Sequence, residues 1–94
     1  MKIYLIFIDA EFDMTDDHIE VNNMLFGGYT SMKKAMIAAV DALKHQCDEY
    51  GFIADSYVMS EADDETVIFD YSCYDEKACT YAQCSVMISP LDVQ

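Results

Sequence analysis

The chain has 94 residues, of which 18 are Asp or Glu and five are Lys, with no Arg, so its formal net charge is −13. This excess of negative charge disfavours direct binding to nucleic-acid phosphates or to an anionic membrane surface, because both need protein cations. Hydrophobic residues make up 53% of the chain, which is enough for a packed core and excludes a disordered chain. We therefore expect one globular domain that spans residues 1–94.

The only long apolar run near the start covers residues 3–8 and ends at Asp9. Six residues are too few for the core of a secretory signal or for a membrane-spanning helix. We therefore expect a soluble, cytoplasmic protein.

Residues 2–12 form the first predicted strand, which begins with an apolar run and then alternates. The continuous run predicts an interior strand whose first half is covered on both faces. From Asp9 onward, Asp9, Glu11 and Asp13 share one face, so that face is expected to lie in water.

A second strand is predicted at residues 19–26, after a polar turn at residues 13–18. Its alternation of apolar and polar residues is weak. Gly27 and Gly28 are expected to lead from this strand into the helix that follows.

The strongest periodic pattern in the sequence lies at residues 30–50 and predicts an amphipathic helix. Thr30 or Ser31 can cap its first turn, and Gly51 can close its last turn. The apolar residues recur at steps of three or four and define the buried face: Met32, Ala35, Met36, Ala39, Val40, Leu43, Cys47 and Tyr50.

Three more strands are predicted after the helix, at residues 52–60, 66–74 and 80–88, separated by polar turns at 61–65 and 75–78. Pro90 is expected to end the last strand, because proline cannot donate a ladder hydrogen bond. The residues expected to face the helix are Val67, Phe69, Tyr71 and Cys73 in one strand and Ala82, Cys84, Val86 and Ile88 in the next.

These elements predict a two-layer α+β fold, with one amphipathic helix packed on a four- to five-stranded, mainly antiparallel sheet. The predicted order of elements is β-(β)-α-β-β-β. No internal repeat or linker interrupts it.

The cysteines do not follow a zinc-binding pattern. No Cys-x-x-Cys pair occurs, and Cys47 and Cys84 fall at apolar positions where a free cysteine packs as a small hydrophobic residue. We therefore interpret the four cysteines as packing residues.

Two other metal motifs are incomplete. His18-Ile19-Glu20 matches half of the zinc deaminase signature, whose Pro-Cys-x-x-Cys half is missing. Asp13, Thr15 and Asp17 have the spacing of a calcium loop without its glycine and its final glutamate. The sequence predicts no metal site and no cofactor.

No catalytic machinery is recognisable either. The chain has no convincing pairing of a nucleophile with a base, no Gly-rich phosphate loop and no Arg to hold an anion. We therefore expect a non-enzymatic protein.

The acidic residues form the remaining pattern. Carboxylates at alternate strand positions are about 6.8 Å apart, a spacing close to that of successive phosphates, and acidic turns can extend the row. The alternative is that acidic turns are ordinary solvated turns that keep the protein soluble. The candidate partner-binding residues are Asp9, Glu11, Asp13, Asp16, Asp17, Asp63, Asp64 and Glu65.

In its length, its MKIYLIFIDAEF opening, its lack of Arg and its distributed acids, the chain resembles small, acidic, phage-encoded proteins that disarm host defences, including anti-CRISPR proteins and other DNA mimics. The resemblance implies an inhibitor in the host cell cytoplasm. We expect a monomer or dimer if the one helix covers the apolar sheet. Such an inhibitor would bind a basic surface of a nucleic-acid-handling defence protein and occlude its nucleic-acid site.

A second hypothesis is a structural or adaptor module that self-associates, or binds a protein, through the face or edge of its sheet. One helix cannot cover all of the tyrosines on the predicted sheet, which favours this alternative. They are Tyr4, Tyr57, Tyr71, Tyr74 and Tyr81. A small-ligand or metal-binding protein is the third hypothesis.

Overall fold

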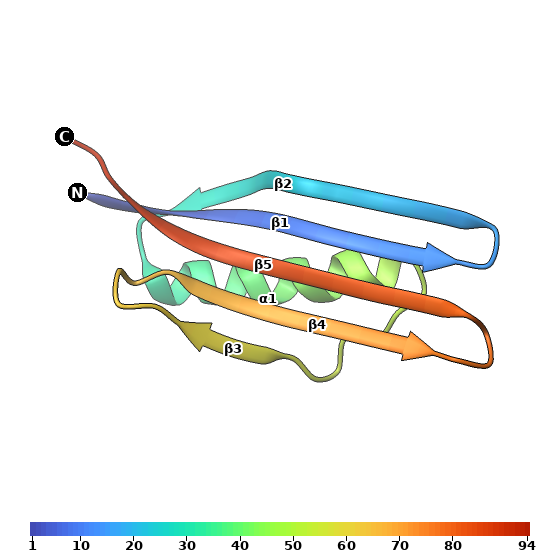
Figure 1. The fold of residues 1–94 in the computed structure, drawn as a ribbon. Helices are drawn as coiled ribbons and strands as arrows, with labels where there is room; N and C mark the ends of the chain where they lie inside the picture. The colour runs from blue at the N-terminus through green and yellow to red at the C-terminus, as the bar shows by residue number, and fades with distance from the viewer.

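The computed structural model describes residues 1–94 and contains one helix and a five-stranded antiparallel sheet (Figure 1). Along the sheet the strand order is β2-β1-β5-β4-β3. The elements are β1 (Lys2–Met14), β2 (Asp17–Tyr29), α1 (Met32–Glu49), β3 (Val58–Glu61), β4 (Val67–Asp75) and β5 (Thr80–Asp92). The predicted α+β class and element order are confirmed.

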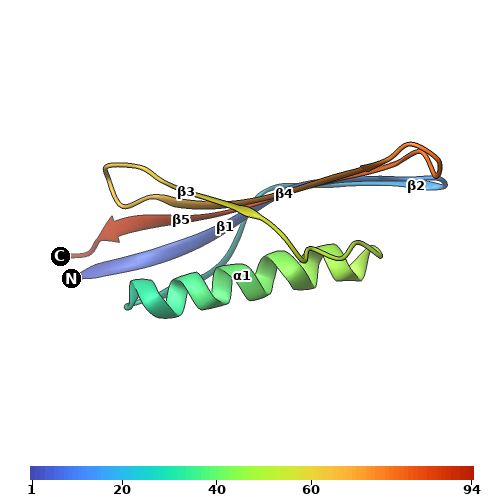
Figure 2. The ribbon, with the colours of Figure 1, turned by 90° about the horizontal axis from the view of Figure 1, so that it is seen from below.

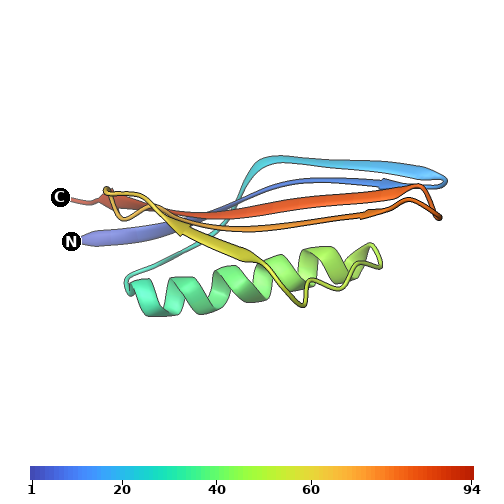
Figure 3. The same cartoon turned by 60° about the horizontal axis from the view of Figure 1, so that its bottom comes forward.

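The helix lies along one face of the sheet, and no element covers the other face (Figure 2). The hairpin turns β1–β2 and β4–β5 project together beyond the end of α1, while both termini lie at the opposite end of the sheet (Figure 3). We call the uncovered side the open face. One face of the sheet is therefore covered by α1, and the open face is not.

The helix follows its predicted pattern closely. Ser31 is the N-cap, and its hydroxyl oxygen accepts a hydrogen bond from the backbone N–H of Lys34 at 3.4 Å. Gly51 follows the last turn with φ at +85°, a backbone conformation that a glycine adopts without strain. Ala35, Leu43 and Cys47 on the predicted face are fully buried.

The core lies between the helix and the covered face, and it contains no polar or charged residue. β1, β4 and β5 alternate along their central parts, so every second side chain there enters this core. From the strands the core receives Ile6, Ile8, Ala10, Phe12, Val67, Phe69, Tyr71, Ala82, Cys84, Val86 and Ile88. The inward-facing residues predicted for β4 and β5 are confirmed, with Cys73 only half-buried.

β1 is an interior strand, as predicted, but its first half is not covered on both faces. Ile6 and Ile8 point into the core, whereas Ile3, Leu5 and Phe7 lie on the open face and remain half-buried. An apolar run does not distinguish a doubly covered strand from a strand with an apolar open face.

β2 is longer than predicted. The turn before it consists of Thr15 and Asp16 alone, so residues 13–14 and 17–18 belong to strands. Gly27 and Gly28 lie inside the ladder, opposite Ile6 and Leu5, and do not lead into the helix. Two irregularities in the ladder, one of them near Asn23 with φ at 49°, weaken the alternation that would have shown the strand.

β3 is shorter than predicted, with four residues in place of nine. The alternating segment 52–57 crosses from the end of the helix to the edge of the sheet and has no strand partner. Phe52 there stacks on Phe12 with ring centroids 5.7 Å apart. Alternation without a neighbouring strand does not produce a β-ladder.

Pro90 does not end β5. The strand continues to Asp92, with Pro90 opposite Tyr4 of β1. Because β4 begins at Val67, opposite Ile88, β5 has a neighbour on one side only beyond that point. Proline is tolerated where one side of a strand is free.

No helix in the structure is both long enough and apolar enough to cross a membrane.

Candidate functional site: the open face of the sheet

The open face is built from the residues that alternate with the core residues. Strand register brings them into rows across β1, β5 and β4, such as Asp9, Ser85 and Asp70, or Phe7, Met87 and Ile68. Within a row, side chains on adjacent strands lie directly opposite each other, with their Cβ atoms about 4.5–5.5 Å apart.

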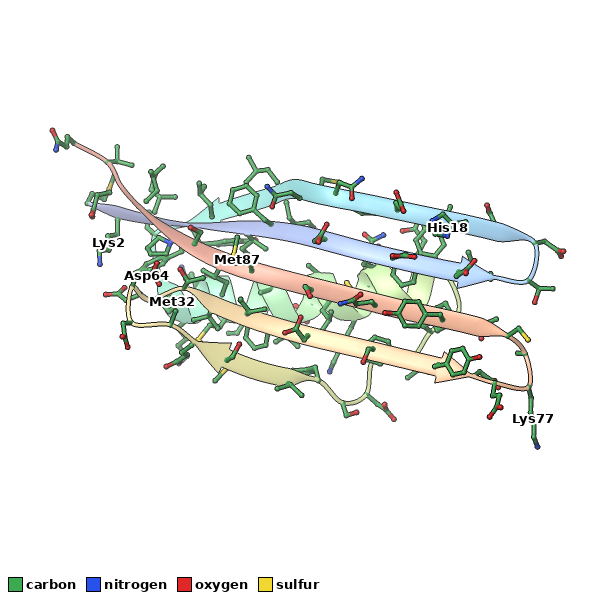
Figure 4. All side chains as sticks on the ribbon, in the orientation of Figure 1. Lys2, His18, Met32, Asp64, Lys77 and Met87 are labelled. Atoms are coloured by element: carbon green, nitrogen blue, oxygen red, sulfur yellow. The ribbon has the colours of Figure 1, made fainter.

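The rows divide the open face into two parts. Near the termini lies an apolar part, whose residues are Ile3, Leu5, Phe7, Leu25, Ile68 and Met87. Toward the hairpin turns lies a polar part, and we call its carboxylates the acidic face: Asp9, Glu11, Asp13, Glu20 and Asp70. Met87 and His18, labelled in Figure 4, lie in the apolar and the polar part respectively.

Asp9 and Asp70 mark the boundary between the two parts. The Ser85 hydroxyl, between them in the row, donates a hydrogen bond to Asp70 Oδ1. The backbone N–H of Asn23 donates to Asp9 Oδ1 at 3.3 Å. A shallow hollow of about 360 Å³ at this boundary is lined by both carboxylates and by apolar side chains that include Phe7 and Met87.

Glu11 and Glu20 lie directly opposite each other on β1 and β2. Like charges in this position destabilise a sheet. Beside them lies a smaller polar hollow of about 110 Å³, also lined by Asp9, Gln83 and Ser85. Carboxylates of the acidic face therefore lie close enough to repel each other.

His18 is the only basic side chain within hydrogen-bonding or ion-pair distance of these carboxylates. Its Nε2 lies 3.2 Å from Glu20 Oε1, and its Nδ1 lies 3.6 Å from Asp13 Oδ1. The hydrogen bond to Glu20 and the surrounding carboxylates raise the pKa of His18 above its usual value.

The lysines do not neutralise the acidic face. The only lysine in an ion pair is Lys2, whose Nζ lies 3.0 Å from Glu65 Oε1 at the end that carries the termini. That contact raises the pKa of Lys2. Lys77 lies in the β4–β5 turn, at the other end of the molecule from Lys2 (Figure 4), and forms no ion pair.

The predicted partner-binding residues fall into two separate groups. Asp9, Glu11 and Asp13 share the open face, and Asp16 and Asp17 extend this group at the β1–β2 turn. At the same end, Asp75 at the end of β4 and Glu76 in the β4–β5 turn add two more carboxylates.

Asp63, Asp64 and Glu65 lie in the β3–β4 turn at the opposite end of the molecule, so the structure does not bring them together with the first group (Figure 4). Glu65 also accepts a hydrogen bond from the Tyr4 hydroxyl at 3.4 Å. Hydrogen bonds from Thr66 lower the pKa of Asp64, so this turn is organised by its own contacts.

Sequence reasoning did not include Glu20, Asp70 or His18 in the site. Asp70 was recognisable as the outward-facing residue between Phe69 and Tyr71. The positions of Glu20 and His18 depend on the register of β2, which follows from the two-residue turn at Thr15 and Asp16.

Two cysteines and a tyrosine of the covered face are buried. Cys47 and Cys84 are fully buried, as predicted, and the neighbouring Cys47 side chain together with burial raises the pKa of the Cys84 thiol. Burial is also the main cause that raises the pKa of Tyr71 to about 12. These groups pack in the core.

No family model, curated protein or solved structure matches this chain.

Proposed function

We propose that this protein is a non-enzymatic inhibitor that binds a basic, nucleic-acid-binding surface of another protein through its acidic face. Its carboxylates would occupy the positions of phosphates and exclude the nucleic acid. The partner class that fits this surface is a nucleic-acid-handling defence protein, as for anti-CRISPR proteins and other DNA mimics.

One observation carries the proposal: the acidic face is uncovered and has no lysine within ion-pair distance. Glu11 and Glu20 are held opposite each other although like charges in this position destabilise a sheet, and His18 is the only basic side chain close enough to offset the repulsion. Surfaces that reduce stability are typical of binding sites, where the charge is used on a partner. A surface needed only for solubility would gain nothing from such close carboxylates.

Electrostatic complementarity explains why a protein partner is favoured. A basic groove attracts this surface over a distance of about 8–10 Å at physiological salt. Such attraction mainly raises the rate of association and the selectivity for the basic partner. The hairpin turns extend beyond the helix (Figure 3), and their acidic residues, which include Asp16 and Glu76, can therefore enter a groove.

The test uses a partner captured from a bacterial lysate and then purified. Replacing Asp9, Glu11 and Asp13 together by Asn, Gln and Asn removes three charges but keeps the shape and the acceptor oxygens. We expect the affinity to fall at least tenfold, which corresponds to about 1.4 kcal/mol. A DNA or RNA oligonucleotide should compete with the wild-type protein for the partner.

The matched control is the triple variant Asp63→Asn, Asp64→Asn and Glu65→Gln, which removes the same charge from the other end. It should retain most of the affinity. Equal losses in the two variants would show that only net charge matters. Simultaneous binding of nucleic acid and this protein to the partner would refute the proposal.

The second candidate function is a self-associating module, and the apolar part of the open face favours it. Leu25 there is 58% exposed, and Phe7, Ile68 and Met87 are only partly covered. Under the inhibitor hypothesis, sedimentation should show a monomer or at most a dimer, because each chain carries a net charge of −13. A larger assembly that persists at high salt would favour the module, since screening does not weaken apolar contacts.

A further inference from the structure

We propose that Glu11, His18 and Glu20 form a binding site for a divalent transition-metal ion. One nitrogen and two carboxylate oxygens, one from each side chain, lie within 4.8 Å of one another on the open face. Two of these residues, Glu11 and Glu20, also belong to the acidic face, but the inference is tested on the isolated protein and so does not depend on the proposed inhibitor function.

The distances fit a metal centre after small side-chain movements. A tetrahedral Zn²⁺ ion with bonds of about 2.0–2.2 Å places its ligand atoms roughly 3.3–3.5 Å apart. His18 Nε2 and Glu20 Oε1 are already 3.2 Å apart. The Glu11 oxygen lies within 4.8 Å of the other two ligand atoms, so it has to approach them by at most about 1.5 Å, which a partly exposed glutamate can do by a change of rotamer.

The backbone holds the three residues in place. Glu11 and Glu20 are paired across β1 and β2, and His18 is two residues before Glu20, on the same face. A site on paired strands is positioned more accurately than one on loops. The turn at Thr15 and Asp16 fixes the register that creates this arrangement.

A fourth residue lies close to the other ring nitrogen of His18. Asp13 is the cross-strand partner of His18, and its Oδ1 lies 3.6 Å from Nδ1. A histidine that binds a metal through one ring nitrogen almost always donates its other N–H to a carboxylate, a backbone carbonyl or water. Asp13 is placed to supply this outer carboxylate after a small side-chain movement, which leaves Nε2 for the ion.

Electrostatics favour a dication at this position. Glu11 and Glu20 repel each other, and none of the five lysines lies in an ion pair with either of them. A bound dication would replace the repulsion by two attractive contacts. The polar hollow of about 110 Å³ that these glutamates line leaves room for water on the ion.

The ligand set indicates the class of metal. Imidazole nitrogen suits zinc, copper, nickel and iron, whereas magnesium and calcium prefer sites made of oxygen ligands alone. Three protein ligands leave at least one position for water, which is the arrangement of open rather than closed zinc sites. Zn²⁺ is therefore the appropriate probe.

The experiment is calorimetric titration of the purified, reduced protein with Zn²⁺, alongside Mg²⁺. We expect one Zn²⁺ per chain, with at least a tenfold loss of affinity in each of the variants His18→Asn and Glu20→Gln. Asp70→Asn removes a charge from the same face outside the cluster and should change the affinity less than twofold. Mg²⁺ should bind far more weakly.

The two histidines provide an internal comparison by NMR. Added Zn²⁺ should shift the ring resonances of His18 and leave those of His45, on the exposed side of α1, unchanged. Equal affinities in wild type and His18→Asn would overturn the proposal, since the ions would then be held only by net charge. A loss of Zn²⁺ binding in Cys79→Ser would also overturn it, because this exposed thiol would then be a ligand.

Discussion

The two faces of the sheet are made by the same strands but follow different rules. On the covered face, β1, β4 and β5 place only apolar side chains against α1, and no polar group is buried there. On the open face, the alternating residues of the same strands change from Phe7 and Met87 near the termini to Asp9 and Glu11 toward the turns. Burial of apolar side chains on the covered face stabilises the fold, whereas neighbouring carboxylates on the open face repel each other.

A pair of neighbouring substitutions in β1 tests this difference most strongly. Ile8 is 1% exposed on the covered face, whereas Phe7 is half-buried on the open face. Ile8→Asp places an unpaired charge in the core, so we expect it to remove most or all of a total stability of about 5–15 kcal/mol. Phe7→Asp should cost about 1–2 kcal/mol and leave the protein folded.

Urea unfolding followed by circular dichroism measures both variants. Similar losses of stability for Ile8→Asp and Phe7→Asp would mean that the open face is also covered in solution. In that case a second molecule would lie on the apolar part, as in the self-association hypothesis.

A smaller effect is expected within the acidic residues themselves. In the metal-free protein, at a pH where His18 is neutral, Glu11→Gln removes the repulsion with Glu20, so it should raise the free energy of unfolding by about 0.2–1 kcal/mol at low salt. Glu65→Gln removes the ion pair with Lys2 at the other end and should give no such gain. Thermal unfolding of the two variants measures the difference, which should shrink as salt rises.

The sign of the Glu11→Gln effect is the informative result. A decrease in stability would show that Glu11 has a stabilising partner in the free protein. The close carboxylates on the open face would then not be evidence for a binding surface.

Sequence periodicity was sufficient where one face of an element is buried. The helix face around Leu43 and the alternation of β4 and β5 were predicted because burial imposes a regular pattern on them. β2 lies at the edge of the sheet with most of its residues exposed, and near Asn23 its ladder is irregular. Its sequence therefore carries no strong alternation.

The candidate site was only partly predictable for the same reason. The spacing of Asp9, Glu11 and Asp13 along one strand follows from the period of two. The approach of Glu20 and His18 to Glu11 depends on pairing between strands, hence on a two-residue turn. Neither Thr15 nor Asp16 has a positive φ, so the turn does not need the Asn-Gly or Asp-Gly pair that usually marks a two-residue hairpin turn in a sequence.

The pairing of β1 with β5 has a consequence for how the chain folds. The first and last strands form the longest ladder of the sheet, from Lys2 opposite Asp92 to Asp13 opposite Tyr81. Residues so far apart in sequence can pair only after a long loop has closed. The entropy of that closure is lost before the contacts stabilise the chain, so folding should be slow for a chain of this size. During synthesis β1 cannot pair with β5 until the last strand has left the ribosome. Until then the apolar residues and the unpaired edge of β1 remain exposed, which favours aggregation.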